Sequence, residues 1–256
     1  MSQAILAALG PNLRVCDSAD FDGTNDYMSR GAGLTGIADS KVGIFSAWFM
    51  LSAFAGSQYL LADTDTGVAA SYFGVRLDTG ANGIAVFAKN AANASICEVH
   101  GASVLSTATW YHLLLEWDMT RAPSSPVIGY LNDSAISFSV TTASNDTIDY
   151  TRNNCFVGAL GNGNVKFDGF MAEYYFAPGQ SIDLTSAANR RKFSSYGGLK
   201  PLFLGGTGAL PTGTAPIIYH SLDDGQAVAN FATNKGTGGN FAITGTLATG
   251  ASSPSD

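Results

Sequence analysis

The sequence has few charged residues, and few basic residues in particular. Only 13% of its 256 residues are Asp, Glu, Lys or Arg, about half the ~25% of an average soluble domain. The 13 Lys and Arg against 20 Asp and Glu give a net charge of −7, which disfavours a nucleic-acid-binding protein because such proteins carry a basic surface. Hydrophobic residues make up 46%, so the chain is not intrinsically disordered. A surface this poor in charge predicts that other subunits cover much of it.

The sequence also lacks a long hydrophobic run. The longest apolar run near its start, from Ala4 to Leu9, is far shorter than the ~20 residues of a membrane-spanning helix. No basic residue precedes this run, which makes it a poor secretory signal. We therefore expect a chain that is not inserted into a membrane and is made, unprocessed, in the cytoplasm.

Cysteine pairs are missing as well. The three cysteines, Cys16, Cys97 and Cys155, form no C-x-x-C motif, which excludes a zinc knuckle or a thioredoxin-type site. Their odd number and long spacings predict free, mostly buried thiols.

Strand patterns dominate what is present. Val42 to Leu51 is a near-continuous apolar run, which indicates a strand with both faces covered. From Tyr72 to Leu77 apolar side chains alternate with Tyr72 and Arg76, which indicates another strand. Further strands are predicted at residues 84–89, 110–118, 127–131, 136–140, 156–160 and 165–176. Short strands with Gly/Asn turns between them predict an all-β fold, an antiparallel two-sheet jelly-roll sandwich.

The composition changes after about residue 197, where Gly and Pro become frequent. We divide the chain into an N-terminal arm (1–14), a jelly roll (15–180) and a C-terminal segment (181–256). This segment is predicted to hold a short helix at 184–193, with Asp183 as its N-cap, and then an extended arm. The arm is too rich in glycine to hold a core alone, so neighbouring subunits or its own jelly roll must order it.

Five motifs in order resemble the LamG-like jelly-roll domains of the concanavalin A-like lectin/glucanase superfamily. They are Asp20–Tyr27, Phe45–Phe49, Thr109–His112, Tyr130–Asp133 and Phe167–Glu173. The sequence departs from the pattern at Asp133, where the family usually has glycine. The resemblance covers residues 20–177 and implies the fold, but not a function, because such folds host many functions.

The C-terminal segment resembles the tail of LamG-like proteins encoded by phages and prophages. The similar stretches are residues 189–193, 213–219 and 230–236. This resemblance implies a structural virion protein of a tailed bacteriophage, a head decoration protein or a tail or fibre component, made in the host cytoplasm. Its partners would be other virion proteins and copies of itself, in a homo-oligomer. The residues expected to contact neighbouring subunits are Arg190, Arg191, Lys192, Phe193, Phe231 and Phe241.

The alternative function is a tail-tip adhesin that binds host surface glycans. Sugar binding in this fold would use exposed aromatic side chains that stack on pyranose rings. The candidates next to loops are Tyr27, Tyr59, Tyr72 and Tyr150. Any one of them can equally belong to the core or to an interface.

Catalysis is not expected. Glycosidases of the superfamily carry Glu-x-Asp-x-x-Glu on one strand, because two nearby carboxylates must act as acid and nucleophile. Glu116 and Asp118 match the first half of that motif, but Arg121 occupies the position of the second Glu. No G-x-S-x-G nucleophile motif is present. We predict that the protein is not an enzyme.

A structural calcium ion is the one cofactor considered. Related jelly rolls often carry one, and Asp22 and Asp26, with Asp168 at the start of the closing strand, could supply carboxylate ligands. The alternative is that Asp22 and Asp26 stabilise a tight turn through hydrogen bonds to its backbone. Asp63 and Asp65 form a second, weaker candidate.

Overall fold

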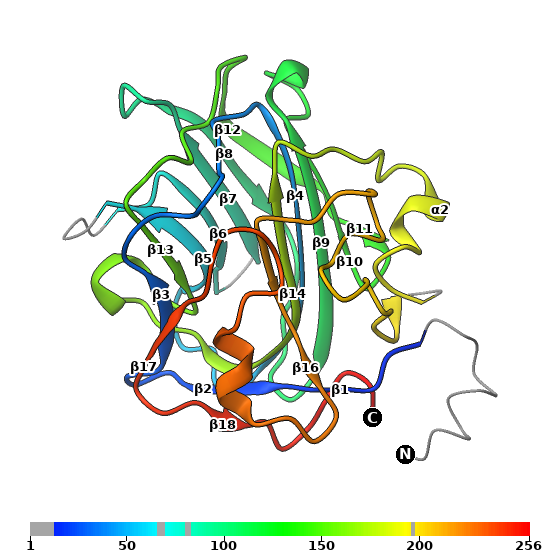
Figure 1. Ribbon diagram of the computed structural model, residues 1–256. Coiled ribbons are helices and arrows are strands. Elements are labelled where there is room, and N and C mark those ends of the chain that lie inside the picture. The colour runs from blue at the N-terminus through cyan, green and yellow to red at the C-terminus, as the bar shows by residue number, and fades with distance from the viewer. Residues whose placement is uncertain (1–12, 66–69, 80–82, 196–197) are drawn as a thin grey trace.

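Two antiparallel sheets face each other and form a sandwich (Figure 1). The structure is a computed structural model that describes residues 13–65, 70–79, 83–195 and 198–256. Each sheet has eight strands, and we name the two sheet I and sheet II. The prediction of an all-β jelly roll is confirmed.

The order of strands in sheet I is β11 (Ser134–Ala135), β10 (Val127–Leu131), β9 (Trp110–Asp118), β4 (Val42–Leu51), β14 (Asp168–Pro178), β2 (Ala19–Asp22) and β18 (Ala248–Thr249), and β15 (Ile218–His220) also pairs with β14. The order in sheet II is β12 (Phe138–Ala143), β8 (Ser95–Gly101), β7 (Ile84–Lys89), β6 (Phe73–Leu77), β5 (Gln58–Thr64), β13 (Asn154–Val157), β3 (Tyr27–Arg30) and β17 (Ala242–Thr244). A separate pair is made by β1 (Cys16–Asp17) and β16 (Leu222–Asp223). The helical turns are η2 (Met119–Arg121), η3 (Gly161–Gly163), α2 (Ala187–Arg190) and η5 (Val228–Ala232).

Strands β4, β7, β9 and β10 have the predicted bounds, but the strand predicted at 136–140 is wrong in extent. Asn132 and Asp133 adopt φ angles of 49° and 62° and form a tight turn, after which β11 pairs back with β10. The chain then crosses to sheet II, where β12 begins at Phe138. Asp tolerates this left-handed conformation better than most residues, which explains how Asp133 fits a turn position where glycine is expected.

The helix predicted at 184–193 is also wrong in extent, because only Ala187–Arg190 is α-helical. Asp183 is not its N-cap: Asp183 Oδ1 instead accepts a hydrogen bond from the Thr185 amide at 2.9 Å. Such local side-chain bonds compete with helix formation. No helix in the described ranges is long and apolar enough to cross a membrane.

Aromatic rings fill the space between the sheets at one end of the sandwich. The ring centroids of Phe73 and Trp117 are 4.8 Å apart, and those of Phe73 and Phe176 are 5.5 Å apart. Trp117 Nε1 donates to the Tyr150 hydroxyl at 2.7 Å, so the polar atoms of this pair are satisfied inside the core. Residues far apart in the sequence are held together here.

The C-terminal segment folds back onto its own jelly roll. Its strand β15 pairs with β14, β17 pairs with β3, and β18 pairs with β2. Figure 1 shows these strands, in orange and red, among the strands of the two sheets. The chain's own jelly roll therefore supplies contacts that order this segment.

Three of the residues expected to contact neighbouring subunits are buried inside this chain, which corrects that prediction. Phe193, Phe231 and Phe241 are 2%, 0% and 7% exposed, because the segment uses them to pack against the sandwich. Arg190 is held by Asp133 and lies over the Tyr130 ring at 4.1 Å. Arg191 and Lys192 are exposed, so they alone of this set remain at the surface.

Candidate functional site

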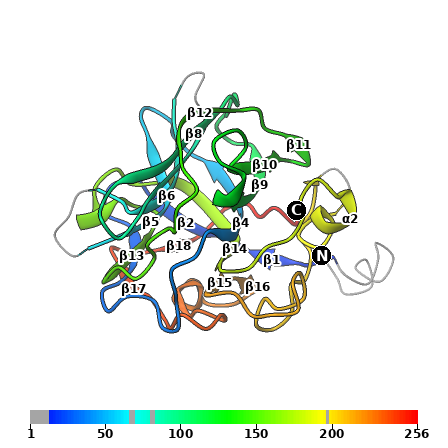
Figure 2. The same ribbon diagram turned by 90° about the horizontal axis from the view of Figure 1, so that it is seen from above.

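The outer face of sheet I is covered by the C-terminal segment (Figures 1 and 2). Buried side chains from the sheet and from the segment form one cluster, which includes Ile44, Leu114, Tyr175, Leu184, Phe193 and Leu204. A ligand cannot reach these sheet residues while the segment is in place.

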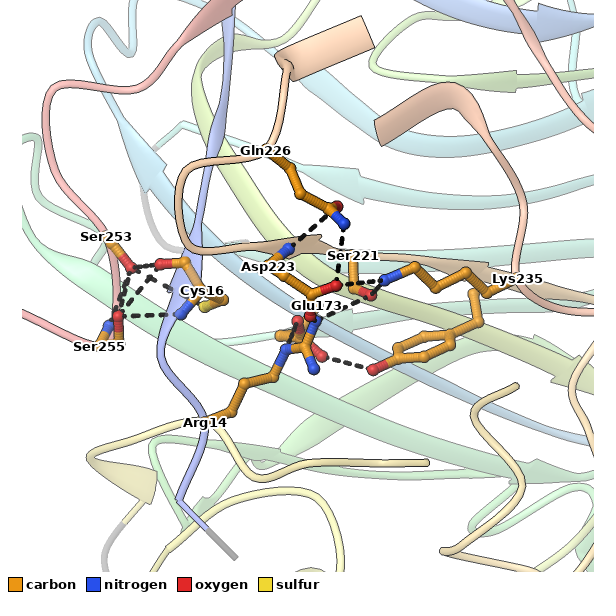
Figure 3. Close-up of polar contacts among 10 residues, drawn as sticks. Arg14, Cys16, Glu173, Ser221, Asp223, Gln226, Lys235, Ser253 and Ser255 are labelled. Atoms are coloured by element: carbon orange, nitrogen blue, oxygen red, sulfur yellow. Dashed lines mark hydrogen bonds and ion pairs between the residues drawn. The ribbon is translucent and has the colours of Figure 1, made fainter. Parts of the chain in front are cut away.

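A buried ion pair fixes the N-terminal part of the chain to β14 (Figure 3). Arg14 Nε lies 2.5 Å from Glu173 Oε1, and the two side chains are 5% and 2% exposed. The Tyr219 hydroxyl donates to Glu173 Oε2 at 2.7 Å. The register of β14 shifts between Ala172 and Tyr175, and Glu173 has a φ of 44°. This bulge directs the carboxylate toward Arg14.

The same network reaches the C-terminal segment (Figure 3). Arg14 Nη2 donates to Asp223 Oδ1 at 2.7 Å, and Lys235 Nζ donates to Ser221 Oγ at 2.8 Å. Burial raises the pKa of the Glu173 carboxyl, although Arg14 and Tyr219 oppose this rise. Every member of this network makes contacts within the chain, so we assign the network to stability.

The chain's last residues contact the buried Cys16. The Cys16 amide donates to Ser255 Oγ at 3.3 Å, and Ser253 Oγ donates to the Cys16 carbonyl (Figure 3). Burial raises the pKa of the Cys16 thiol. All three cysteines are free and buried, as the sequence predicts.

Glu116 and Asp118 have structural roles. Glu116 Oε1 accepts from Arg121 Nη1 at 3.0 Å, and Glu116 Oε2 accepts from the Leu184 amide at 3.2 Å. Asp118 Oδ1 accepts from the Thr120 amide at 2.9 Å and caps η2. Both carboxylates therefore make contacts that hold local structure within this chain.

The acidic turn at Asp22, Asp26 and Asp168 is held by hydrogen bonds. Asp22 Oδ1 accepts from the amides of Thr24, Asn25 and Asp26 at 2.8, 2.9 and 3.1 Å, and these bonds lower the pKa of Asp22. Asp26 Oδ1 accepts from the Thr246 amide at 2.7 Å. The Asp22 bonds are those expected of a residue that stabilises a turn, and the Asp26 bond joins this turn to the C-terminal segment.

Calcium binding at this turn stays a prediction without geometric support. Asp168 pairs with Asp22 across the sheet, and burial followed by the charge of Asp22 raises the pKa of Asp168. Among the residues that the structure describes, no group of three or more His, Cys, Asp or Glu is placed to hold a metal ion.

The two residues of the second acidic pair, Asp63 and Asp65, have different environments: Asp63 is buried and Asp65 bonds to Arg152. Asp63 is 1% exposed, and neither of its carboxylate oxygens has a hydrogen-bond partner in the described part of the chain. Burial, and then the charge of Asp149, raises the pKa of Asp63 well above its usual value. Asp65 instead accepts from Arg152 Nη1 at 3.2 Å.

The outer face of sheet II carries a row of polar and aromatic side chains. Cross-strand pairs place Tyr59 opposite Arg76, Arg76 opposite Ala85, and Ala85 opposite His100. The neighbours of Arg76 along β6, Val75 and Leu77, are part of the core. Because side chains alternate along a strand, Arg76 and its cross-strand partners point to the outside.

Arg76 is fixed at the centre of this row. Its Nε and Nη2 donate to Asp78 Oδ1 and Oδ2 at 2.6 and 2.8 Å. The guanidinium lies 4.5 Å from the Phe87 ring centroid and 5.8 Å from that of Tyr59. Burial raises the pKa of the Asp78 carboxyl, but hydrogen bonds from Arg76 and Ser57 outweigh burial, so the pKa is lowered overall. The site therefore presents a rigid, charged and aromatic surface.

His100 and Glu98 extend the row toward the edge of the sheet. His100 Nε2 lies 3.2 Å from Glu98 Oε1, and His100 Nδ1 lies 3.8 Å from Asp78 Oδ2. The side chains of Arg76, His100 and Glu98 are 25%, 17% and 34% exposed. We name the outer face around Tyr59, Arg76, Asp78, Phe87, Glu98 and His100 the Arg76 face.

The four candidate tyrosines have different positions. Tyr59 is 6% exposed, and the Arg76 guanidinium lies over its ring. Tyr72 is half-buried, with Arg152 and Lys89 over its ring at 4.3 and 5.4 Å. Tyr27 is half-buried against Phe156, with ring centroids 5.8 Å apart. Tyr150 is fully buried, so the prediction that it binds a ligand is wrong: its hydroxyl pairs with Trp117 inside the core.

Comparisons with known proteins identify the fold. No protein-family model matches the sequence, and no curated protein matches it. A putative carbohydrate-binding protein from Bacteroides ovatus has a similar structure, with a TM-score of 0.62 and 14% identity; the alignment covers 94% of this chain and 61% of that protein. A heptameric pentraxin from Limulus polyphemus aligns with a TM-score of 0.54 and 10% identity over 92% of this chain and 94% of the other. At these identities the similarities concern the fold alone, a jelly-roll sandwich.

Proposed function

We propose that the protein is a non-enzymatic binding module that recognises a glycan on the Arg76 face. The observation that carries this proposal is the contrast between the two outer faces. The C-terminal segment buries the outer face of sheet I, whereas Arg76, His100 and Glu98 on sheet II remain partly exposed.

The chemistry of the Arg76 face suits sugar hydroxyls. Carboxylates and guanidinium groups bind hydroxyls with charge-assisted hydrogen bonds, and aromatic rings contact the apolar faces of sugars. His100 Nδ1 is buried and lies 3.8 Å from Asp78 Oδ2, so the polar contacts to a ligand fall to the exposed parts of Arg76 and Glu98. The fold shared with the Bacteroides ovatus protein, described as a putative carbohydrate-binding protein, supports the same proposal.

A printed array of bacterial surface polysaccharides tests this proposal. We expect the intact chain to bind at least one polysaccharide, and Arg76→Ala to weaken that binding by about tenfold or more, because hydrogen bonds to charged groups contribute about 1.5–3 kcal/mol. Lys192→Ala, on the exposed surface of the C-terminal segment, is the control and should bind normally. Absence of binding, or equal binding by Arg76→Ala, would contradict the proposal.

A second proposal is that the module belongs to a tailed-phage virion, where it would contact other virion proteins or host glycans. Its support is the similarity of residues 189–193, 213–219 and 230–236 to phage-encoded proteins. A further support is strand β12 at the end of sheet II, which carries no Asp, Glu, Lys or Arg. We expect quantitative mass spectrometry to detect the chain in purified particles. A copy number similar to that of the capsid or tail-tube protein would indicate decoration or shell structure, and a few copies would indicate the tail tip or fibres. Absence of the chain from particles would reject the virion role.

A further inference from the structure

Sheet II ends in an open strand edge at β12. The Ala102 amide donates to the Ser137 carbonyl at 3.3 Å, so Ser137 faces β8. In an antiparallel pair, hydrogen-bonding groups alternate in direction along the strand. The N–H and C=O groups of Phe138 and Val140 therefore point away from β8, toward the free edge.

This edge lacks most of the features that usually keep strand edges apart. Natural proteins protect free edges with charged side chains, proline, a β-bulge or a covering element. From residue 134 to residue 145 the sequence contains no Asp, Glu, Lys, Arg or Pro. Ser139, Val140 and Thr141 are exposed, and no described strand lies beyond β12. Of the protective features, only a bulge between Val140 and Thr142 is present in the described strand.

A groove with a mixed lining, which includes Ser124 and Ser125 as well as apolar side chains, runs beside the edge, where β10 and β11 of sheet I approach β12. Its volume is about 230 Å³, and its lining includes Val127, Ile128, Ile136, Phe138 and Val140. Val140 is 37% exposed. A strand added to β12 would place its own side chains next to this groove and bury apolar surface there.

We propose that β12 pairs with β12 of a second copy, antiparallel across a two-fold axis. Two identical antiparallel strands satisfy each other's main-chain groups, which makes the contact self-complementary. Each copy carries a net charge of −7, which opposes association. Two copies therefore meet at the lowest electrostatic cost through an uncharged surface. This edge provides such a surface. A pair of short strands buries less area than the ~1,200–2,000 Å² of a stable interface, so the dimer should depend on concentration.

Analytical ultracentrifugation of the full chain over a range of concentrations tests this pairing. We expect a monomer–dimer equilibrium for the natural chain. Val140→Lys would place like charges near the two-fold axis and should shift the midpoint of dimerisation at least tenfold higher in concentration. The matched control is Val165→Lys: Val165 is 41% exposed and lies between η3 and β14, away from β12. This control should dimerise like the natural chain.

Hydrogen–deuterium exchange gives a second readout that does not depend on a variant. The amides of Phe138 and Val140 should exchange more slowly as the concentration of the natural chain rises. The pairing is rejected if the natural chain stays monomeric, if Val140→Lys dimerises as well as Val165→Lys, or if a dimer forms without slower exchange in β12. None of these results depends on glycan binding, so they test the pairing separately from the proposed function.

Discussion

Arg14→Ala should lower the free energy of unfolding by about 3–5 kcal/mol, the usual cost of removing one partner from a buried ion pair. Arg14 lies 2.5 Å from Glu173 and 2.7 Å from Asp223. Without the guanidinium, the Glu173 carboxylate is left buried, with the Tyr219 hydroxyl as its remaining side-chain donor. Urea denaturation followed by tryptophan fluorescence measures the loss.

Two further variants separate the ion pair from a general effect of truncation. Lys192→Ala removes an exposed cation from the C-terminal segment and should change the unfolding free energy by less than about 0.5 kcal/mol. In a double-mutant cycle, Arg14→Ala combined with Glu173→Gln should cost less than the sum of the single changes. Additive losses, or a cost of Arg14→Ala no larger than that of Lys192→Ala, would show that the ion pair contributes little.

Phe231→Ala is expected to cost about 3–5 kcal/mol of unfolding free energy, as for other large-to-small changes in a core. Phe231 is fully buried, with its ring centroid 6.4 Å from that of Phe21 in β2 and 5.6 Å from that of His220 in β15. The C-terminal segment is thus part of the same hydrophobic core as the jelly roll. Thermal unfolding should remain a single transition at a lower midpoint.

The control for this prediction is Phe203→Ala in the same segment. Phe203 is 47% exposed, so its loss should cost less than about 1 kcal/mol. If Phe231→Ala were as mild as Phe203→Ala, or if the segment unfolded in a separate earlier transition, the segment would be an arm that is ordered independently of the sandwich.

Much of the sandwich could be predicted from the sequence because its signal is local. Apolar residues recur on each face of Val42–Leu51, and the structure has β4 there. Trp110–Asp118 likewise forms β9. The path of the C-terminal segment could not be predicted, because contacts with residues distant in the sequence fix it. Ile218, for example, pairs with Phe176, and a segment so rich in glycine and proline shows no periodic pattern that would predict this pairing.

The candidate site was only partly predictable for the same reason. Alternation along 72–77 places Arg76 opposite the core residues, so its outward position could be inferred from the sequence. Its contacts with Asp78 and Phe87 depend on turn geometry and strand register, which the sequence does not specify. The prediction for Tyr150 is wrong. Its position next to a loop suggests exposure, but the residue is buried between the sheets.

The burial of the phenylalanines changes how assembly can occur. Phe193, Phe231 and Phe241 stabilise the chain itself, so contacts between copies must use surfaces that remain free. The exposed β12 edge and the Arg76 face are on the same sheet. Pairing through β12 would join two such sheets and give one assembly two Arg76 faces, which would raise the avidity for a repeating polysaccharide.

We propose that the Arg76 face binds a glycan, while the C-terminal segment closes the outer face of sheet I to ligands. Hydrogen–deuterium exchange at a fixed protein concentration, with and without a saturating polysaccharide identified on the array, tests it most directly. Binding at the Arg76 face predicts slower exchange in β6, β7 and β8, with β9 and the C-terminal segment unchanged. Slower exchange confined to the C-terminal segment or to sheet I would contradict the claim.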